Sequence, residues 1–129
     1  MKRRGILNAD LSAALARLGH TDLIVIGDCG LPRPPGVPVV DLAVTFGVPS
    51  FADVVRALAD EIVVEQAWIA EETVDANPAI QPLVAECFGE PETISHEELK
   101  ARSAAAVLVV RTGEATAYAN VIVRCGVPF

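Results

Sequence analysis

The chain has 129 residues, of which 52% are hydrophobic and only 5% aromatic, and its formal net charge is −7. A chain of this length is expected to form a single domain with one core. The negative charge argues against binding to nucleic acid. No apolar run approaches the roughly 20 residues of a membrane-spanning helix. The apolar excess instead predicts a well-buried sheet, or subunit surfaces hidden in an oligomer.

Three cysteines, Cys29, Cys87 and Cys125, are odd in number and widely spaced. They form no C-x-x-C pair and no metal-ligand spacing, so no metal site is expected. This usage predicts reduced, packed thiols in a cytoplasmic protein. The basic residues at the N-terminus lead into no apolar segment of the kind that a secretory signal requires.

The first half of the chain predicts two helices and two strands around a long loop. An asparagine cap opens a helix over residues 8–18, and the glycine that follows is a natural helix end. The β-branched run 23–26 predicts a buried strand. Residues 27–38, rich in glycine and proline, predict a loop, and residues 39–43 a second strand. A capping-box pattern predicts a helix over 50–59.

The second half continues the alternation of strands and helices. Residues 62–70 predict a long strand, and an Asn-Pro pair opens a helix over 77–87. A second capping-box pattern predicts a helix over 96–103, and the apolar runs 105–110 and 121–124 predict strands. This alternation indicates an α/β fold, with three α/β/α layers around a central mixed sheet in a single domain over residues 1–129.

His20 and Asp28 flank the first predicted strand, one before it and one after it. A histidine beyond a helix can simply interact with the helix dipole and the last carbonyl groups. Asp28 stands at the carboxyl end of the strand, where α/β sheets bind ligands. It can equally form an Asx-turn that satisfies the loop backbone.

Two further pairs of polar residues are candidates for ligand binding. His96 and Lys100 are four residues apart and share a helix face, although a solvated helix start explains them equally well. Tyr118 and Asn120 lie on one side of an extended segment and offer donors and acceptors together, unless the tyrosine is only a loop anchor.

The acidic residues Glu65, Glu71 and Glu72, in contrast, are interpreted as solvated carboxylates at the edge or end of the long strand. The chain has no phosphate-binding loop, no dinucleotide fingerprint and no G-x-S-x-G motif. The polar candidates therefore suit proton transfer on a small polyhydroxylated ligand and hydrogen bonding to it.

Nine short motifs follow one another along the chain. They are G-I-L-N-A-D-L, L-G-H-T-D, G-D-C-G-L-P, V-D-L-A-V-T-F-G-V-P-S-F, A-E-E, N-P, S-H-E-E-L-K, R-T-G-E-A-T-A-Y-A-N and C-G-V-P-F. In this order the chain resembles the D-ribose pyranase family, which is related to the fucose mutarotases. The fucose-type relatives lack the G-L-P and V-T-F-G-V-P-S-F blocks, which favours ribose.

The resemblance implies an isomerase that interconverts the β-pyranose and β-furanose forms of D-ribose without a cofactor. It also implies a ring-shaped homo-oligomer, typically a decamer of two stacked pentamers, with the site near a subunit boundary. His20 matches the family's proton donor. The sugar-contacting positions fall on Asp28, His96, Lys100, Tyr118 and Asn120.

In this hypothesis His20 delivers a proton to the ring oxygen, because the unperturbed imidazole pKa of about 6.5 lies near working pH. Asp28 then orients the sugar or the imidazole itself. Two alternatives stay open. One is a non-catalytic ribose-binding accessory of a sugar transport system, and the other is an assembly protein whose polar residues are incidental.

Overall fold

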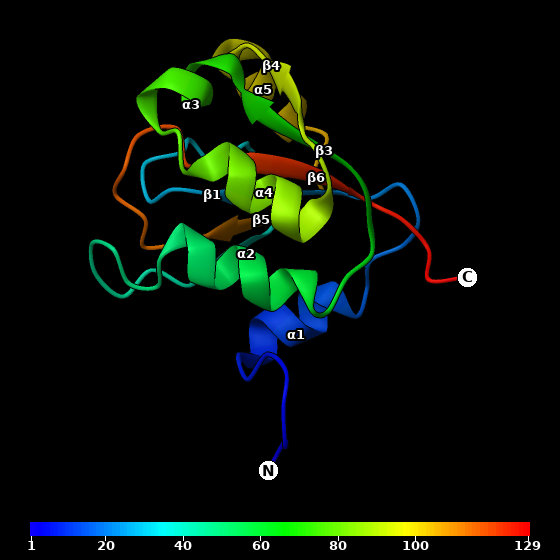
Figure 1. The fold of residues 1–129 in the computed structure, drawn as a ribbon. Helices are drawn as coiled ribbons and strands as arrows, with labels where there is room; N and C mark the ends of the chain where they lie inside the picture. Colours follow the sequence, from blue (N-terminus) through cyan, green and yellow to red (C-terminus); the bar gives the residue numbers. More distant parts are fainter.

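The computed structural model describes residues 1–129, which form six strands in one sheet and five helices (Figure 1). The strands are β1 (Leu23–Gly27), β2 (Val39–Asp41), β3 (Val64–Ala70), β4 (Glu92–Ile94), β5 (Leu108–Arg111) and β6 (Val121–Cys125). Their order in the sheet is β2-β5-β1-β6-β3-β4. Only β6 runs antiparallel to its neighbours, β1 and β3, and the other pairs are parallel. The mixed sheet predicted from the sequence is therefore confirmed.

The helices cover both faces of this sheet, which confirms the three-layer α/β/α arrangement (Figure 1). They are α1 (Ala9–Leu15), α2 (Phe51–Ala59), α3 (Glu71–Ala76), α4 (Ile80–Phe88) and α5 (His96–Ser103). Side chains of α1, α2 and α4 pack on one face in a cluster of 20 buried residues. Leu99 of α5 packs on the other face in a cluster of eight. None of the helices has both the length and the apolar character needed to cross a membrane.

Three predicted helix caps are formed. The Asn8 side chain accepts a hydrogen bond from the Leu11 backbone N–H at 2.9 Å and opens α1. Ser50 and Asp53 form a reciprocal capping box at α2, and the Ser95 hydroxyl accepts from the Glu98 N–H at 3.1 Å at α5. Each cap satisfies a backbone donor that the first helical turn leaves free.

Some predicted boundaries are wrong, and two short elements were missed. Helix α1 ends at Leu15 rather than near residue 18, so the glycine at position 19 is not its cap. Pro78 does not open α4, which begins at Ile80, and the Asn77 side chain does not cap it but donates to the Thr116 hydroxyl at 2.8 Å. Helix α3 and strand β4 were not predicted. Helix α3 begins without a side-chain cap, and β4 contains no long apolar run.

The two ends of the sheet differ in what they carry. We call the end at which β1 to β5 finish, and at which β6 begins, the carboxyl end, and the opposite end the amino end. Asp28, His96 and the segment before β6 lie at the carboxyl end. His20, which precedes β1, lies at the amino end. The candidate residues are thus divided between opposite ends of the molecule.

Candidate functional site

Asp28 and Asn120 form a reciprocal pair at the carboxyl end. The Asp28 backbone N–H donates to Asn120 Oδ1, and Asn120 Nδ2 donates to Asp28 Oδ2, both at 2.9 Å. Asn120 is only 1% exposed, so its orientation is fixed. The Gly30 N–H also donates to Asp28 Oδ1 at 2.9 Å, which is the predicted Asx-turn. Each carboxylate oxygen keeps lone pairs for a further donor.

Gly27 makes room for this pairing, and no sequence pattern indicated its role. A Cβ atom at this position would lie 2.7 Å from Leu31 Cδ2 and 3.0 Å from Asn120 Oδ1. Both separations are shorter than ordinary contacts, so a side chain here would press on the Leu31 side chain and the Asn120 amide. The glycine therefore belongs to the architecture of the site.

His96 and Tyr118 form a second pair, with their ring centroids 5.1 Å apart in an edge-to-face arrangement. Helix α3 holds both residues. Glu72 Oε2 accepts from the His96 backbone N–H at 3.0 Å, and the Thr73 hydroxyl donates to the Tyr118 carbonyl at 3.0 Å. Tyr118 has a φ of 58°, which a side chain adopts only when its surroundings enforce it. Glu71 and Glu72 are exposed directly after the end of β3, as predicted, and they begin a helix, α3, that supports the site.

The His96 ring has a free polar atom. Its Nδ1 is buried and has no hydrogen-bond partner in the structure. Buried polar atoms are nearly always paired, so an unpaired one at a candidate site indicates a place for a ligand atom. The interpretation of His96 as a merely solvated helix start does not fit this burial.

Lys100 lies one turn after His96 on α5, where its Nζ pairs with Glu97 Oε1 at 2.5 Å. The hydrogen bond from Lys100 lowers the pKa of Glu97 below its ordinary value. The Lys100 side chain is 33% exposed and forms no hydrogen bond to the other candidate residues. Its contact with a sugar stays a prediction.

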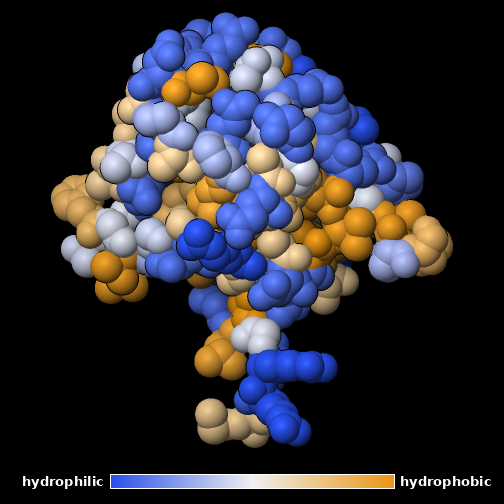
Figure 2. Space-filling view, in the orientation of Figure 1, coloured by the Kyte–Doolittle hydropathy of each residue, from blue (hydrophilic) through white to orange (hydrophobic).

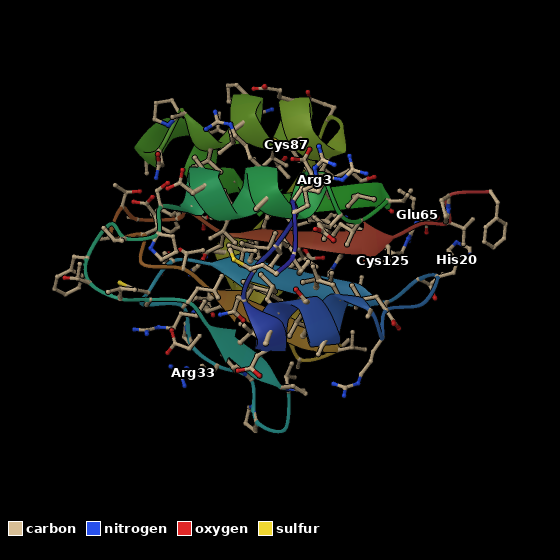
Figure 3. All side chains as sticks on the ribbon, turned by 90° about the horizontal axis from the view of Figure 1, so that it is seen from below. Arg3, His20, Arg33, Glu65, Cys87 and Cys125 are labelled. Atoms are coloured by element: carbon tan, nitrogen blue, oxygen red, sulfur yellow. The ribbon has the colours of Figure 1, made fainter.

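His20, at the amino end, is paired with Glu65. Its Nε2 lies 3.0 Å from Glu65 Oε2, and Arg124 Nε donates to Glu65 Oε1 at 2.5 Å. Figure 3 shows His20 and Glu65 side by side near Cys125. The hydrogen bonds from His20 and Arg124 lower the pKa of Glu65. Glu65 is therefore an exposed carboxylate, as predicted, but it is also paired with His20 and Arg124, which the sequence did not indicate.

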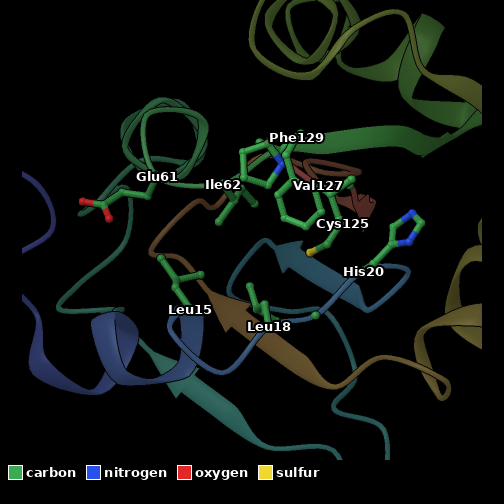
Figure 4. A pocket seen from close by; sticks show the side chains of 12 residues that line it. Leu15, Leu18, His20, Glu61, Ile62, Cys125, Val127 and Phe129 are labelled. Carbon is green, nitrogen blue, oxygen red and sulfur yellow. The ribbon is translucent and has the colours of Figure 1, made fainter.

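A cavity of about 530 Å³ adjoins His20, which lies at its rim (Figure 4). Its walls are mostly apolar and include Leu15, Leu18, Ile62 and the C-terminal segment 126–129. Burial raises the pKa of the Cys125 thiol in this cavity to about 11. The residues clustered at the carboxyl end do not line it.

The structure does not bring His20 and Asp28 of one chain together. They flank β1, whose five residues at about 3.3 Å each separate them by roughly 17 Å. The pairs Asp28–Asn120 and His96–Tyr118 are assembled at one end, and the acid–base candidate lies at the other. No group of three or more histidine, cysteine or carboxylate side chains is placed to hold a metal ion.

The arrangement matches known proteins along the whole chain. The RbsD / FucU transport protein family matches residues 1–128. D-ribose pyranase 1 of Rubrobacter xylanophilus and D-ribose pyranase 2 of Streptomyces griseus are each 56% identical to this chain, with all of both proteins covered.

Two solved structures share the fold. Bacillus subtilis RbsD, solved in complex with D-ribose, superposes with a TM-score of 0.94 at 46% identity, covering all of both chains. The fucose mutarotase of Streptococcus pneumoniae, solved with L-fucose, gives a TM-score of 0.83 at 19% identity, again over both whole chains. The first agreement extends to sequence, and the second is one of fold alone. This chain belongs to the RbsD / FucU transport protein family.

Proposed function

We propose that this protein is a D-ribose pyranase, an isomerase that interconverts β-D-ribopyranose and β-D-ribofuranose. The observation that carries the proposal is the 56% identity, from end to end, to proteins named D-ribose pyranase. The related RbsD structure contains D-ribose. The whole chain, residues 1–129, acts as one domain of this family.

The carboxyl end supplies the groups that hold the sugar. Asp28 accepts hydrogen bonds from sugar hydroxyls, and the buried amide of Asn120 keeps its carboxylate in place. The unpaired Nδ1 of His96 bonds one hydroxyl. The Tyr118 hydroxyl and the Lys100 amine bond the remaining ones. A polyhydroxylated ring suits this set, because each of its hydroxyls can both donate and accept a hydrogen bond.

His20 carries out the proton transfer. Ring opening requires a proton on the ring oxygen and the loss of one from the anomeric hydroxyl, and ring closure on another hydroxyl reverses these steps. General acid–base help of this kind accelerates reactions by roughly 10²–10⁴-fold. That is adequate here, because sugar rings already open slowly in water, so the proposed mechanism uses no cofactor.

A second copy of the chain completes the site. Since His20 and the sugar-holding residues lie at opposite ends of β1, His20 of one copy meets Asp28 of the next in a head-to-tail contact. Head-to-tail contacts form a ring when the rotation from one copy to the next closes. The ring proposed here is the pentamer of the family, and two rings stack into a homodecamer.

Exposed apolar side chains at both ends support this contact. Val44 and Phe46, in the loop after β2 at the carboxyl end, are 80% and 82% exposed, and Phe129 at the other end is 99% exposed. Figure 2 shows apolar surface over both this loop and the C-terminal segment, on opposite sides of the molecule. Apolar surface of this kind marks interaction sites.

The protein acts in the cytoplasm in this proposal. All three cysteines are free, although the molecule is small and would gain stability from disulfides in an oxidising compartment. D-ribose is the partner, and the proposal includes neither nucleic acid nor membrane.

Exchange NMR of D-ribose tests the proposal directly. The native protein is expected to speed the exchange between the pyranose and furanose anomeric signals. Ribose signals that broaden without faster exchange would instead identify a non-catalytic sugar-binding accessory. If neither effect occurs with ribose, the pyranase assignment fails, and L-fucose is the next sugar to test.

A further inference from the structure

Glu65 occupies an irregular position in the sheet. Val64 pairs with Cys125 and Gln66 pairs with Arg124, so the register between β3 and β6 shifts across Glu65. A bulge of this kind redirects a side chain at the end of a sheet. Here it directs the Glu65 carboxylate to His20, which lies 45 positions earlier in the chain.

Both carboxylate oxygens of Glu65 are occupied. Oε2 lies 3.0 Å from His20 Nε2, and Oε1 accepts from Arg124 Nε at 2.5 Å. Because Arg124 holds one oxygen, the other is fixed in position toward the imidazole. An ionised carboxylate only accepts hydrogen bonds, so His20 Nε2 has to carry the proton of this contact. The hydrogen bonds from His20 and Arg124 lower the pKa of Glu65, which keeps it ionised.

Arg124 is itself anchored on a buried residue. Its guanidinium carbon lies 5.7 Å from the centre of the Trp68 ring. Trp68 is 5% exposed, and its indole N–H donates to Glu92 at 3.0 Å. A chain of contacts therefore runs from the core through Arg124 and Glu65 to the otherwise exposed imidazole of His20.

We infer that Glu65 is a positioning residue for His20, which fixes the ring proton on Nε2 and presents Nδ1 as the atom that exchanges protons with the sugar. The inference rests on the proposed function of His20. Carboxylate partners fix imidazole tautomers in the same way in other acid–base sites.

The proton steps balance with this assignment. His20, protonated on both nitrogens, gives its Nδ1 proton to the ring oxygen as the bond from C1 to that oxygen breaks, and the anomeric hydroxyl loses its proton to water. The C4 hydroxyl then attacks C1 and returns a proton to Nδ1, and the carbonyl oxygen regains one from water. The Nε2 proton stays on the imidazole throughout and is hydrogen-bonded to Glu65.

The tautomer can be read directly, because the chain contains only two histidines. Nitrogen-15 magic-angle-spinning NMR of sedimented, histidine-labelled protein separates the two rings, and a His96→Gln variant identifies the signals of His20. The neutral ring of His20 in the native protein is expected to carry its proton on Nε2. A proton on Nδ1 would overturn the inference, whatever the variants do.

Kinetics supply the second readout. Glu65→Gln is expected to lower kcat about 10-fold, which is less than the roughly 10²–10⁴-fold that general acid–base help supplies in full, while KM changes less than about twofold. It is also expected to place part of the His20 population in the other tautomer. The matched control is Glu90→Gln, which removes a carboxylate paired with Gln81 on α4 and is expected to leave kcat unchanged.

The outcomes separate this inference from the proposed function. A native protein that fails to speed ribose exchange refutes the pyranase function, and the tautomer measurement still decides whether Glu65 fixes the ring. A native protein that is active, with Glu65→Gln as active as Glu90→Gln, refutes the positioning role alone. Reduced kcat together with a changed tautomer supports both.

Discussion

The two ends of the sheet hold their polar residues in different ways. At the carboxyl end, Asn120 is 1% exposed and bonded to Asp28 twice. At the amino end, the His20 side chain is 53% exposed and is fixed mainly by Glu65. The end proposed to hold the sugar is fixed by buried hydrogen bonds, whereas the end proposed to transfer protons is exposed in the single chain and would be covered by a second copy in the proposed ring. We therefore expect changes at the amino end to alter the rate of catalysis, and changes at the carboxyl end to alter stability and sugar binding.

The largest expected effect is the loss of catalysis in His20→Ala. General acid–base help is worth roughly 10²–10⁴-fold, and this variant is expected to lose most of it. The unfolding midpoint should stay close to native, since the side chain is largely exposed. Exchange NMR of ribose together with thermal unfolding checks both expectations. Near-native exchange rates would remove His20 from the mechanism.

Asn120→Ala should have the opposite profile. It leaves the Asp28 backbone N–H without its acceptor, which costs about 1–3 kcal/mol in the free energy of unfolding. Ribose affinity should fall as well, because the Asp28 carboxylate loses its support. Urea unfolding and calorimetric titration measure the two effects. The control is Asn77→Ala, which removes exposed hydrogen bonds from the Asn77 side chain to Thr116 and Ala117 and should cost less.

A smaller effect concerns acid stability at the carboxyl end. Burial raises the pKa of Glu114, but hydrogen bonds from the backbone N–H groups of Phe51, Thr116 and Ala115 outweigh it, and the net pKa lies below the ordinary 4.5. The contribution of Glu114 is therefore fully present above about pH 4.5. It is lost as the pH falls through the lowered value.

Glu114→Gln removes this titrating contribution. The variant should be less stable than the native protein at pH 7, and the difference in stability should shrink as the pH falls below 4.5. Urea unfolding across this range measures the difference. A stability gap that does not change with pH would contradict the assignment.

The smallest effect is on thiol chemistry in the cavity beside His20. With its pKa at about 11, Cys125 should react with iodoacetamide roughly 100-fold more slowly at pH 8 than an ordinary thiol. Cys29, which is partly exposed at the carboxyl end, should be modified first. Peptide mass spectrometry over time gives the order of modification. Early labelling of Cys125 would contradict the burial of this thiol and its raised pKa.

Much of the fold could be predicted from the sequence, because local rules fix it. The capping residues Asn8, Ser50 and Ser95 predict where three helices begin, and runs of β-branched residues predict the buried strands. Helix α3 has no such signal, since Ala70 precedes it without a side-chain cap. Strand β4 has only three residues and depends on its pairing with β3.

The candidate residues were named from the sequence, but the contacts that pair them were not predicted. Asp28 and Asn120 were each identified, yet they are 92 positions apart and no local pattern joins them. Glu65 was set aside because a carboxylate in a strand is usually solvated, and only the bulge directs it to His20. The sequence did argue against a contact between His20 and Asp28 of one chain, because the strand predicted between them places the two residues at its opposite ends.

The most direct test of the account mixes two inactive variants. His20→Ala and Asp28→Asn are co-expressed, and ribose exchange is measured in the co-assembled rings. If neighbouring copies share each site in a head-to-tail ring, about one quarter of the sites regain both native residues, and activity should return to about that fraction. Each variant expressed alone stays inactive. If mixed rings are as inactive as the separate variants, the two residues act within one chain and the shared site is wrong.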